Sequence, residues 1–203
     1  MIDINAYISD PPLWLMQVYT SPWALIDELD NTISKELLLL SDQYHVQDNV
    51  AVHKDAVIEQ GVVFKGKIII SPFCYVSANA YLRGPVFLGN AVNIGPGSEI
   101  KQSIILDNSA VAHFNYIGNS IIGKNVNFEA GSICANHYNE RENKNILIKI
   151  DNNIIDTKIN KFGALVGDHS KIGANAVLSP GTILQKGSIV KRLELIEQVN
   201  LST

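Results

Sequence analysis

The chain has 203 residues, of which 46% are hydrophobic, and a formal net charge of −4. This length suits one domain with short appendages, and the apolar content is sufficient for a hydrophobic core. The acidic balance gives no reason to expect nucleic acid or an anionic membrane surface as a partner. The sequence contains neither a secretory signal pattern nor an apolar stretch long enough to span a bilayer, which favours a cytoplasmic protein.

Residues 1–45 are predicted to form an N-terminal helical cap. The pair Ser21-Pro22 is favourable at a helix start, and an apolar stripe follows it, made of Trp23, Leu25, Ile26, Leu29, Ile33 and Leu37. The open end of a repeat fold exposes unpaired strand edges that need protection. We therefore expect this helix to cover the first turn of the repeat that follows, although its apolar face could also bind a partner.

A six-residue period begins at Val46 and continues to Val111. Each unit starts with a large apolar residue and has a smaller or β-branched residue four positions later; the starts are Val46, Val52, Ile58, Phe64, Ile70, Val76, Leu82, Leu88, Ile94, Ile100 and Leu106, and the later partners include Cys74, Ile104 and Ala110. Period six fits neither an amphipathic helix nor an alternating strand, and hexapeptides are typical of a β-helix. The sequence thus predicts an all-β fold, a parallel β-helix over residues 46–190, with both positions pointing inward.

The period slips twice by one residue and is then interrupted. Later starts are Val111, Ile117, Ile122, Phe128 and Cys134, and the period resumes with Val166, Ile172, Leu178, Leu184 and Val190. Cys74 and Cys134 fall on inward positions, so they are expected to be small buried hydrophobes and not a disulfide or metal pair.

The interruption at residues 135–161 is a polar loop followed by two apolar segments around Asp151-Asn152-Asn153, which predicts a β-hairpin. Such an insertion lies near a functional surface or packs between subunits, and both readings stay open. Residues 191–203 are predicted to form a short amphipathic C-terminal helix or tail.

One segment is more specific than the repeat. His113 is followed by Tyr116-Ile-Gly, then by Asn127 and Asn136, and Arg83, Glu99 and Lys101 precede it. Over residues 80–190 this pattern resembles the acetyltransferase domain of the bifunctional N-acetylglucosamine-1-phosphate uridylyltransferase/glucosamine-1-phosphate N-acetyltransferase, a hexapeptide-repeat acyltransferase. The segment 156–168 also resembles related stand-alone sugar-nucleotidyltransferase-like β-helix proteins. The resemblance implies a left-handed parallel β-helix, a homotrimer and acetyl-CoA as co-substrate.

Arg83 and Lys101 stand 18 residues apart, each directly after an inward aliphatic residue. They should therefore stack on one outer face, about 4.8 Å apart. Two neighbouring cations suit an anion, because arginine offers a fork for phosphate and lysine a point charge. Alone, both residues are more simply solvated surface charges; the resemblance favours binding of a sugar 1-phosphate.

The resemblance also assigns the remaining roles. His113 is the expected general base, because an imidazole titrates near neutral pH, and Glu99 is expected to orient it. Tyr116 and Asn127 are implied to hold the phosphate and sugar, and Asn136 to approach the sugar amine and thioester. Ala164 and Ser179 are candidates for a cofactor wall. The chain departs from the family at Glu129, which replaces a glycine, and at His137, which replaces a tyrosine.

Three functions compete. The first is an acetyl-CoA-dependent N-acetyltransferase acting on an amino-sugar 1-phosphate or its nucleotide. The second is a non-catalytic β-helix that binds a sugar phosphate or assembles with a separate nucleotidyltransferase, because fold alone does not set function. The third is a γ-type carbonic anhydrase, which needs three histidines converging on zinc. No second histidine lies near His113 in that pattern, so no metal site is expected.

Overall fold

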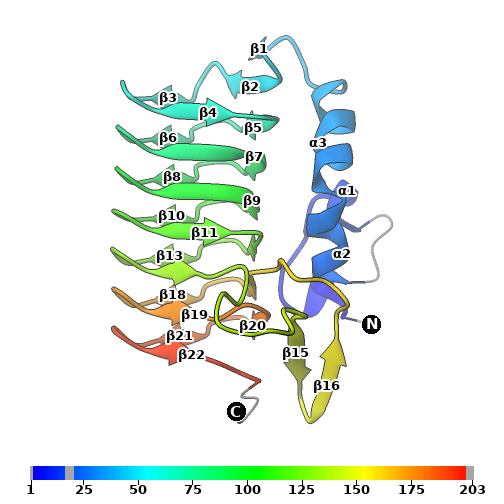
Figure 1. Ribbon diagram of the computed structural model, residues 1–203. Helices are drawn as coiled ribbons and strands as arrows, with labels where there is room; N and C mark the ends of the chain where they lie inside the picture. Colours follow the sequence, from blue (N-terminus) through cyan, green and yellow to red (C-terminus); the bar gives the residue numbers. More distant parts are fainter. Residues whose placement is uncertain (1, 17–20, 200–203) are drawn as a thin grey trace.

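Figure 1 shows the computed structural model of the protein, which describes residues 2–16 and 21–199. Short parallel strands stack on one another in a column, and each turn of the chain pairs with the turns above and below it. Paired residues are 18 positions apart in the first turns, for example Val76 and Ile94, and 17 apart in the middle turns, for example Val111 and Phe128. In the last turns they are again 18 apart, as Ile172 and Val190 are. The parallel β-helix predicted from the period is confirmed.

The column has three faces. The small-sheet face consists of β3 (Val57–Ile58), β6 (Tyr75–Val76), β8 (Asn93–Ile94), β10 (Ala110–Val111), β13 (Asn127–Phe128), β18 (Lys171–Ile172) and β21 (Ile189–Val190). A larger sheet forms the other two. Its first part, called here the row face, contains β4 (Val63–Lys65), the beginnings of β7 (Tyr81–Leu88) and β9 (Glu99–Ile105), β11 (Tyr116–Gly118), β14 (Ile133–Cys134), β19 (Val177–Leu178) and β22 (Leu195–Ile196).

The third face, called here the covered face, continues the larger sheet around a corner. It contains β2 (Val50–His53), β5 (Ile68–Ile70), the ends of β7 and β9, β12 (Ile121–Ile122), β17 (Ala164–Val166) and β20 (Thr182–Leu184). Its strands are apolar on both sides: Ile68 and Ile70 face the interior of the column, whereas Ile69 faces outward and is also buried. A strand that is buried on both faces appears in the sequence as a continuous run of apolar residues, as in Ile68–Ile70.

Most predicted inward residues line the interior, including both cysteines, Phe128 and Ile172. The prediction is wrong at Ala110, which is partly exposed on the small-sheet face and borders an open groove. It is also wrong at Ile104 and Leu106, which lie outside the column in a second apolar cluster, while Ile105 takes the inward position. The reason is a register shift between β7 and β9. Gln102 lies within this corner with a φ of 44°. The first slip of the period therefore occurs at this corner, one unit earlier than the sequence suggested.

The first predicted unit also differs. Val46 lies in β1 (Tyr44–Gln47), which pairs antiparallel with β2, and its side chain is 52% exposed. The parallel repeat therefore begins at β2. Because β1 pairs antiparallel, it adds a hairpin strand to the edge of the larger sheet where the repeat begins.

The N-terminal segment contains η1 (Ile4–Ala6), α1 (Leu13–Met16), α2 (Pro22–Asp27) and α3 (Leu29–Leu37). The helix start at Ser21-Pro22 agrees with the prediction. The expected position is wrong, because these helices run along the side of the column and do not cover its first turn (Figure 1). Leu25, Leu29 and Ile33 pack in one cluster with the outward residues of the covered face. That face needs such a cover because its outer side is itself apolar.

The predicted hairpin is present as β15 (Leu147–Ile150) and β16 (Asn153–Asp156), joined at Asp151-Asn152. The predicted C-terminal helix is wrong over residues 191–199, where the chain instead forms β22 and pairs with β19. Ile196 packs against the interior, so the repeat continues by one more strand where a helix was expected. Within the described ranges, the structure contains no helix that is both long and apolar enough to cross a membrane.

Candidate functional site

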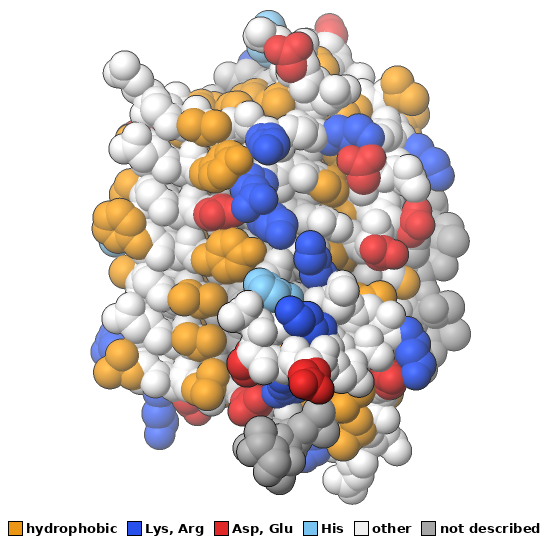
Figure 2. Space-filling model, in the orientation of Figure 1, with side chains coloured by type: hydrophobic (Ala, Val, Ile, Leu, Met, Phe, Trp, Pro, Cys, Tyr) orange, Lys and Arg blue, Asp and Glu red, His pale blue; other side chains and the backbone are white. Residues whose placement is uncertain are grey.

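The row face carries a line of basic side chains. Lys65, Arg83 and Lys101 occupy the same register position on β4, β7 and β9. The predicted stacking of Arg83 on Lys101 is therefore confirmed, and Lys65 extends it by one strand. Figure 2 shows Lys and Arg side chains following one another along this side of the column. Adjacent strands lie about 4.8 Å apart, so the three cations are close neighbours.

Lys161 adds a fourth cation that the sequence analysis missed. It lies on the return segment of the insertion, directly before the buried Phe162. It borders a cavity together with Gln102, which follows Lys101, and with Asn119, whose N–H donates to the Lys101 carbonyl at 2.8 Å. Its charge is also one of the causes that lower the pKa of Lys101. We call Lys65, Arg83, Lys101 and Lys161 the basic row. The long insertion hid this relationship, because the pairing across it, Ile122 with Val166, skips 44 residues.

Positive charge in the basic row is only partly compensated. Burial is the main cause that lowers the pKa of Lys101, followed by Lys161 and Arg83, while Glu99 acts in the opposite direction. Among the described residues, the ion pairs of the protein include neither Lys101 nor Lys161. A bound anion would favour the charged form of Lys101. The row therefore presents positive charge that is only partly neutralised, on a chain that is acidic overall.

Glu99 pairs with Arg83 at 2.7 Å, and this hydrogen bond raises the pKa of the Arg83 guanidinium. Tyr116 pairs with Glu99 in register, and burial followed by the charge of Glu99 raises the pKa of the Tyr116 phenol, against the effect of Arg83. Over the described residues, Glu99 makes no hydrogen bond to His113. The orienting contact expected between these two is thus not seen, and Glu99 instead holds the arginine of the row.

His113 lies at the corner between β10 and β11, where the small-sheet face meets the row face. Its carbonyl accepts hydrogen bonds from Asn115 Nδ2 at 3.2 Å and from the Gly131 backbone N–H at 2.9 Å, so the corner is fixed by its neighbours. The side chain itself is exposed and borders an open groove of about 340 Å³, with Tyr75 and Ala110 among the other lining residues. The imidazole is therefore accessible from outside the column.

Asn127 and Asn136 lie apart from the basic row. Asn127 is exposed on the small-sheet face, stacked between Ala110 and Lys171. Asn136 is buried: its Nδ2 donates to Asn119 Oδ1 at 2.6 Å, and its carbonyl accepts from the Phe162 backbone N–H at 3.0 Å. Within one chain, Asn136 thus fixes both ends of the insertion to the column.

The two residues expected in a cofactor wall are not open to a ligand in the single chain. The Ala164 side chain faces the interior of the column and is fully buried. Ser179 is nearly buried, its N–H donates to the Ile196 carbonyl at 3.0 Å, and its carbonyl accepts from Thr182 Oγ1 at 2.6 Å. The return of the chain after the insertion places both inside the packing of the later turns.

The two departures from the family pattern have structural explanations. Glu129 accepts two hydrogen bonds from Arg192, at 2.7 and 2.6 Å, and one from the Ala174 N–H at 2.9 Å. This pairing also lowers the pKa of the Glu129 carboxyl. Nδ1 of His137 lies 3.2 Å from Asn136 Oδ1. Glu129 therefore joins turns of the column, and its negative charge is already matched by an arginine.

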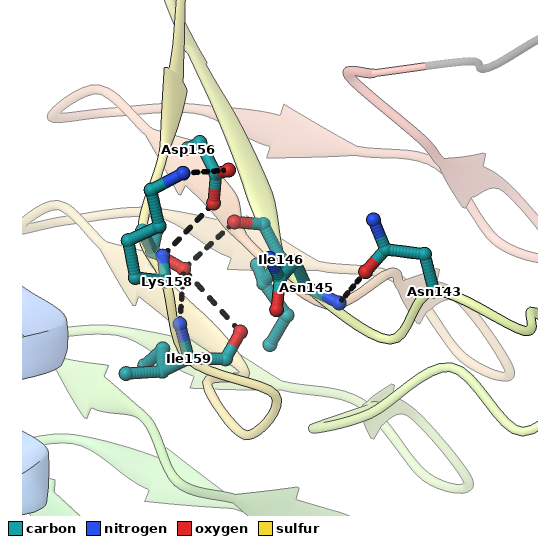
Figure 3. A network of polar contacts seen from close by, with 7 residues as sticks. Asn143, Asn145, Ile146, Asp156, Lys158 and Ile159 are labelled. Atoms are coloured by element: carbon teal, nitrogen blue, oxygen red, sulfur yellow. Dashed lines mark hydrogen bonds and ion pairs between the residues drawn. The ribbon is translucent and has the colours of Figure 1, made fainter.

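The insertion folds onto its own chain. Tyr138 donates to the Pro180 carbonyl at 3.0 Å, and the Phe162 ring packs edge-on against Trp23 with centroids 6.3 Å apart. Figure 3 shows the base of the hairpin, where Asp156 and Lys158 pair at 2.7 Å. A cavity of about 340 Å³ separates the insertion from the column and is lined by Gln102, Asn119, Lys161 and residues of α2. The insertion therefore delivers Lys161 to the site of its own chain.

Among the described residues, no group of three or more His, Cys, Asp or Glu side chains is arranged to hold a metal ion.

Comparisons with known proteins identify relatives of this chain. Residues 46–147 match the family model described as GMPPB C-terminal domain. The chain is 36% identical over 204 residues to the bifunctional protein GlmU of Methanococcus vannielii, covering 93% of this chain and 44% of that protein. It is 32% identical over 166 residues to a bifunctional sugar-1-phosphate nucleotidylyltransferase/acetyltransferase of Sulfurisphaera tokodaii, covering 79% and 41%.

The chain thus spans less than half the length of these curated relatives. A solved hexapeptide transferase family protein from Anaplasma phagocytophilum has the same fold, with a TM-score of 0.51 at 15% identity, covering 69% of this chain and 72% of that one. The match to the family model extends over half of the sequence, from the first hairpin to the insertion. The protein therefore belongs to the family of β-helices represented by the GMPPB C-terminal domain.

Proposed function

We propose that the protein transfers an acetyl group from acetyl-CoA to the amine of an amino-sugar 1-phosphate. The observation that carries this proposal is the basic row on the open row face, beside Tyr116, with Lys101 and Lys161 outside the ion pairs of the described residues. His113 is exposed at the corner where this face begins. The names of the relatives from Sulfurisphaera and Methanococcus support the same class of reaction.

Lys101 and Lys161 would hold the phosphate as point charges. One guanidinium nitrogen of Arg83 donates a hydrogen bond to Glu99, and the other N–H groups of the guanidinium are still able to donate. Binding of the dianion would be strongest while the Lys101 amine keeps its proton. Tyr116 lies beside these groups and can donate its hydroxyl to the phosphate or the sugar.

The reaction would proceed at the corner. The sugar amine attacks the thioester carbonyl carbon, a C–N bond forms, and the C–S bond breaks as coenzyme A leaves. His113 would take the proton that the amine nitrogen loses and return it to the leaving thiolate. Its exposure supports this role, because a substrate could approach the imidazole from outside the column. The oxyanion formed during attack needs hydrogen-bond donors, which backbone N–H groups can supply.

A homotrimer would complete the site. Exposed apolar side chains recur in register on both open faces: Val63, Ile133 and Leu195 on the row face, and Val57, Tyr75 and Ile189 on the small-sheet face. Repeated apolar exposure of this kind is a mark of a contact surface. A neighbouring copy packed there would bring its small-sheet face, including Asn127, close to the row of the first copy.

A second candidate is a β-helix that binds the sugar phosphate without catalysis. It is favoured by the engagement of Glu99 with Arg83, which leaves His113 without the acidic partner that a general base often has.

The test follows release of the coenzyme A thiol from acetyl-CoA with glucosamine 1-phosphate as acceptor. The wild type should turn over, His113→Ala should lose turnover, and His45→Ala, a change at an exposed histidine of β1, should keep it. Lys101→Ala should raise KM for the acceptor. Undiminished turnover in His113→Ala would contradict the assignment of the base. A wild type that binds the sugar phosphate without turnover would establish the second candidate.

A further inference from the structure

The basic row is longer than one phosphate requires. Lys101 and Lys161 already provide two cations for a single phosphate, yet Arg83 and Lys65 continue the row over two more strands. At about 4.8 Å per strand, Lys65 lies roughly 10 Å from Lys101 along the column. Lys65 therefore lies two strands away from the phosphate that Lys101 and Lys161 would hold.

Lys65 is exposed, and among the described residues it has no carboxylate partner. Its neighbour Lys67, two residues later, is instead paired with Asp30 of α3 at 2.5 Å. The same short segment thus contains one lysine used to hold a helix and one left open toward the row face. The open lysine is the one that stacks in register on Arg83.

The basic row extends away from the level of His113, where the amine of the acceptor would react. Tyr116, three residues after His113, lies one strand from Lys101, and Arg83 and Lys65 lie progressively further from that level. An acceptor with its amine at His113 and its first phosphate at Lys101 would therefore extend toward Arg83 and Lys65. Tyr81 flanks this end, with the Arg83 guanidinium 5.7 Å from its ring centroid, and offers a flat aromatic surface.

We propose that Lys65 and Arg83 form a second phosphate subsite, and that the acceptor is an amino sugar linked to a nucleoside diphosphate. The inference rests on the proposed function and narrows its substrate class. The bridging oxygen of a diphosphate places the second phosphate next to the first, where Arg83 and then Lys65 follow Lys101. The guanidinium fork suits phosphate oxygens, and the Tyr81 ring can stack on a nucleobase.

The experiment measures binding and turnover separately. Dissociation constants for UDP-glucosamine and for glucosamine 1-phosphate are measured by calorimetry on the wild type, Lys65→Ala and Lys54→Ala. Lys54 is an exposed lysine of the turn after β2 that lies outside the row, so it controls for loss of one charge. Lys65→Ala should weaken binding of UDP-glucosamine about tenfold, as loss of one charge-assisted hydrogen bond implies, and leave glucosamine 1-phosphate unchanged.

Equal affinity of Lys65→Ala and the wild type for UDP-glucosamine would overturn the second subsite. So would equal weakening of both ligands, or a loss of the same size in Lys54→Ala. Turnover with each acceptor tests the proposed function independently. If the wild type binds UDP-glucosamine through Lys65 and transfers no acetyl group, the subsite stands and the acetyltransferase proposal fails. If it acetylates only glucosamine 1-phosphate and Lys65→Ala has no effect, the reverse holds.

Discussion

Arg83 and Glu99 form an ion pair of 2.7 Å between adjacent strands of the row face, in the middle of the basic row. The pair assigns Glu99 to positioning an arginine, whereas sequence reasoning assigned it to orienting His113. It also sets the direction of the Arg83 guanidinium while leaving further N–H groups able to donate.

Glu99→Gln tests this relationship. The change should alter KM for a phosphorylated acceptor by less than about fivefold, because exposed ion pairs contribute little. It should leave the acidic limb of the pH profile of kcat/KM in place, since Glu99 does not contact His113. Steady-state kinetics across pH provide the measurement. A shift of that limb in the variant would show that Glu99 acts through the histidine after all.

The lowered pKa of Lys101 predicts how acceptor binding depends on pH. Burial, Lys161 and Arg83 all disfavour the charged amine, so the amine loses its proton at a lower pH than an ordinary lysine. Affinity for glucosamine 1-phosphate should fall as pH rises through that pKa. In Lys161→Met the fall should begin at a higher pH, because one repelling charge is gone, even though overall affinity is weaker.

Calorimetric titrations from about pH 7 to 10 would follow this effect. Lys158→Met is the matched control, because Lys158 lies on the same insertion and is already paired with Asp156. An identical pH dependence in Lys161→Met and the wild type would mean that Lys161 does not act on Lys101.

Substitution of Asn136 distinguishes a structural role of this side chain from a role in binding the substrates. Asn136→Ala would leave the buried Asn119 Oδ1 without its donor, which costs about 1–3 kcal/mol of unfolding free energy. The insertion should loosen as well, and with it the position of Lys161. Urea unfolding measures the first effect and acceptor affinity the second. A fully stable Asn136→Ala protein with impaired turnover would instead favour direct contact with the substrates.

The interior of the column should be sensitive to truncation. Phe128 is fully buried there, and Phe128→Ala should lower the free energy of unfolding by about 3–5 kcal/mol. Phe73→Ala is the control, because Phe73 lies at a corner with 68% of its surface exposed. Similar losses in both variants would argue against the interior packing described for Phe128.

Assembly can be tested at one register position of the row face. Ile133 is 37% exposed and follows Tyr116 in register, so Ile133→Arg should place a charge in the proposed contact between copies and reduce the molar mass of the particle. Ile154 is 60% exposed on the hairpin, and Ile154→Arg should leave the mass unchanged. Light scattering during size-exclusion chromatography gives both values. A monomeric wild type would remove the trimer from the proposal.

The repeat, the interior side chains of most turns and the stacking of Arg83 on Lys101 all follow from the amino-acid sequence. These are consequences of a period along one chain: once strands pair in parallel, residues one turn apart must become neighbours. The hairpin at Asp151-Asn152 was predictable for the same local reason, because its turn and its flanking strands are close in sequence.

The remaining features depend on contacts between parts of the chain that are far apart in the sequence. The period does not show on which side an N-terminal helix packs. The helices lie alongside the column because they bury the apolar outer side of the covered face. A shift at Gln102 moved Ile105 inward in place of Leu106, since a one-residue change in register is invisible where three apolar residues adjoin. Lys161 lies near Lys101 only because the insertion folds back on its own chain. Glu99 pairs with Arg83 because the guanidinium lies within hydrogen-bond distance of its carboxylate in the folded protein.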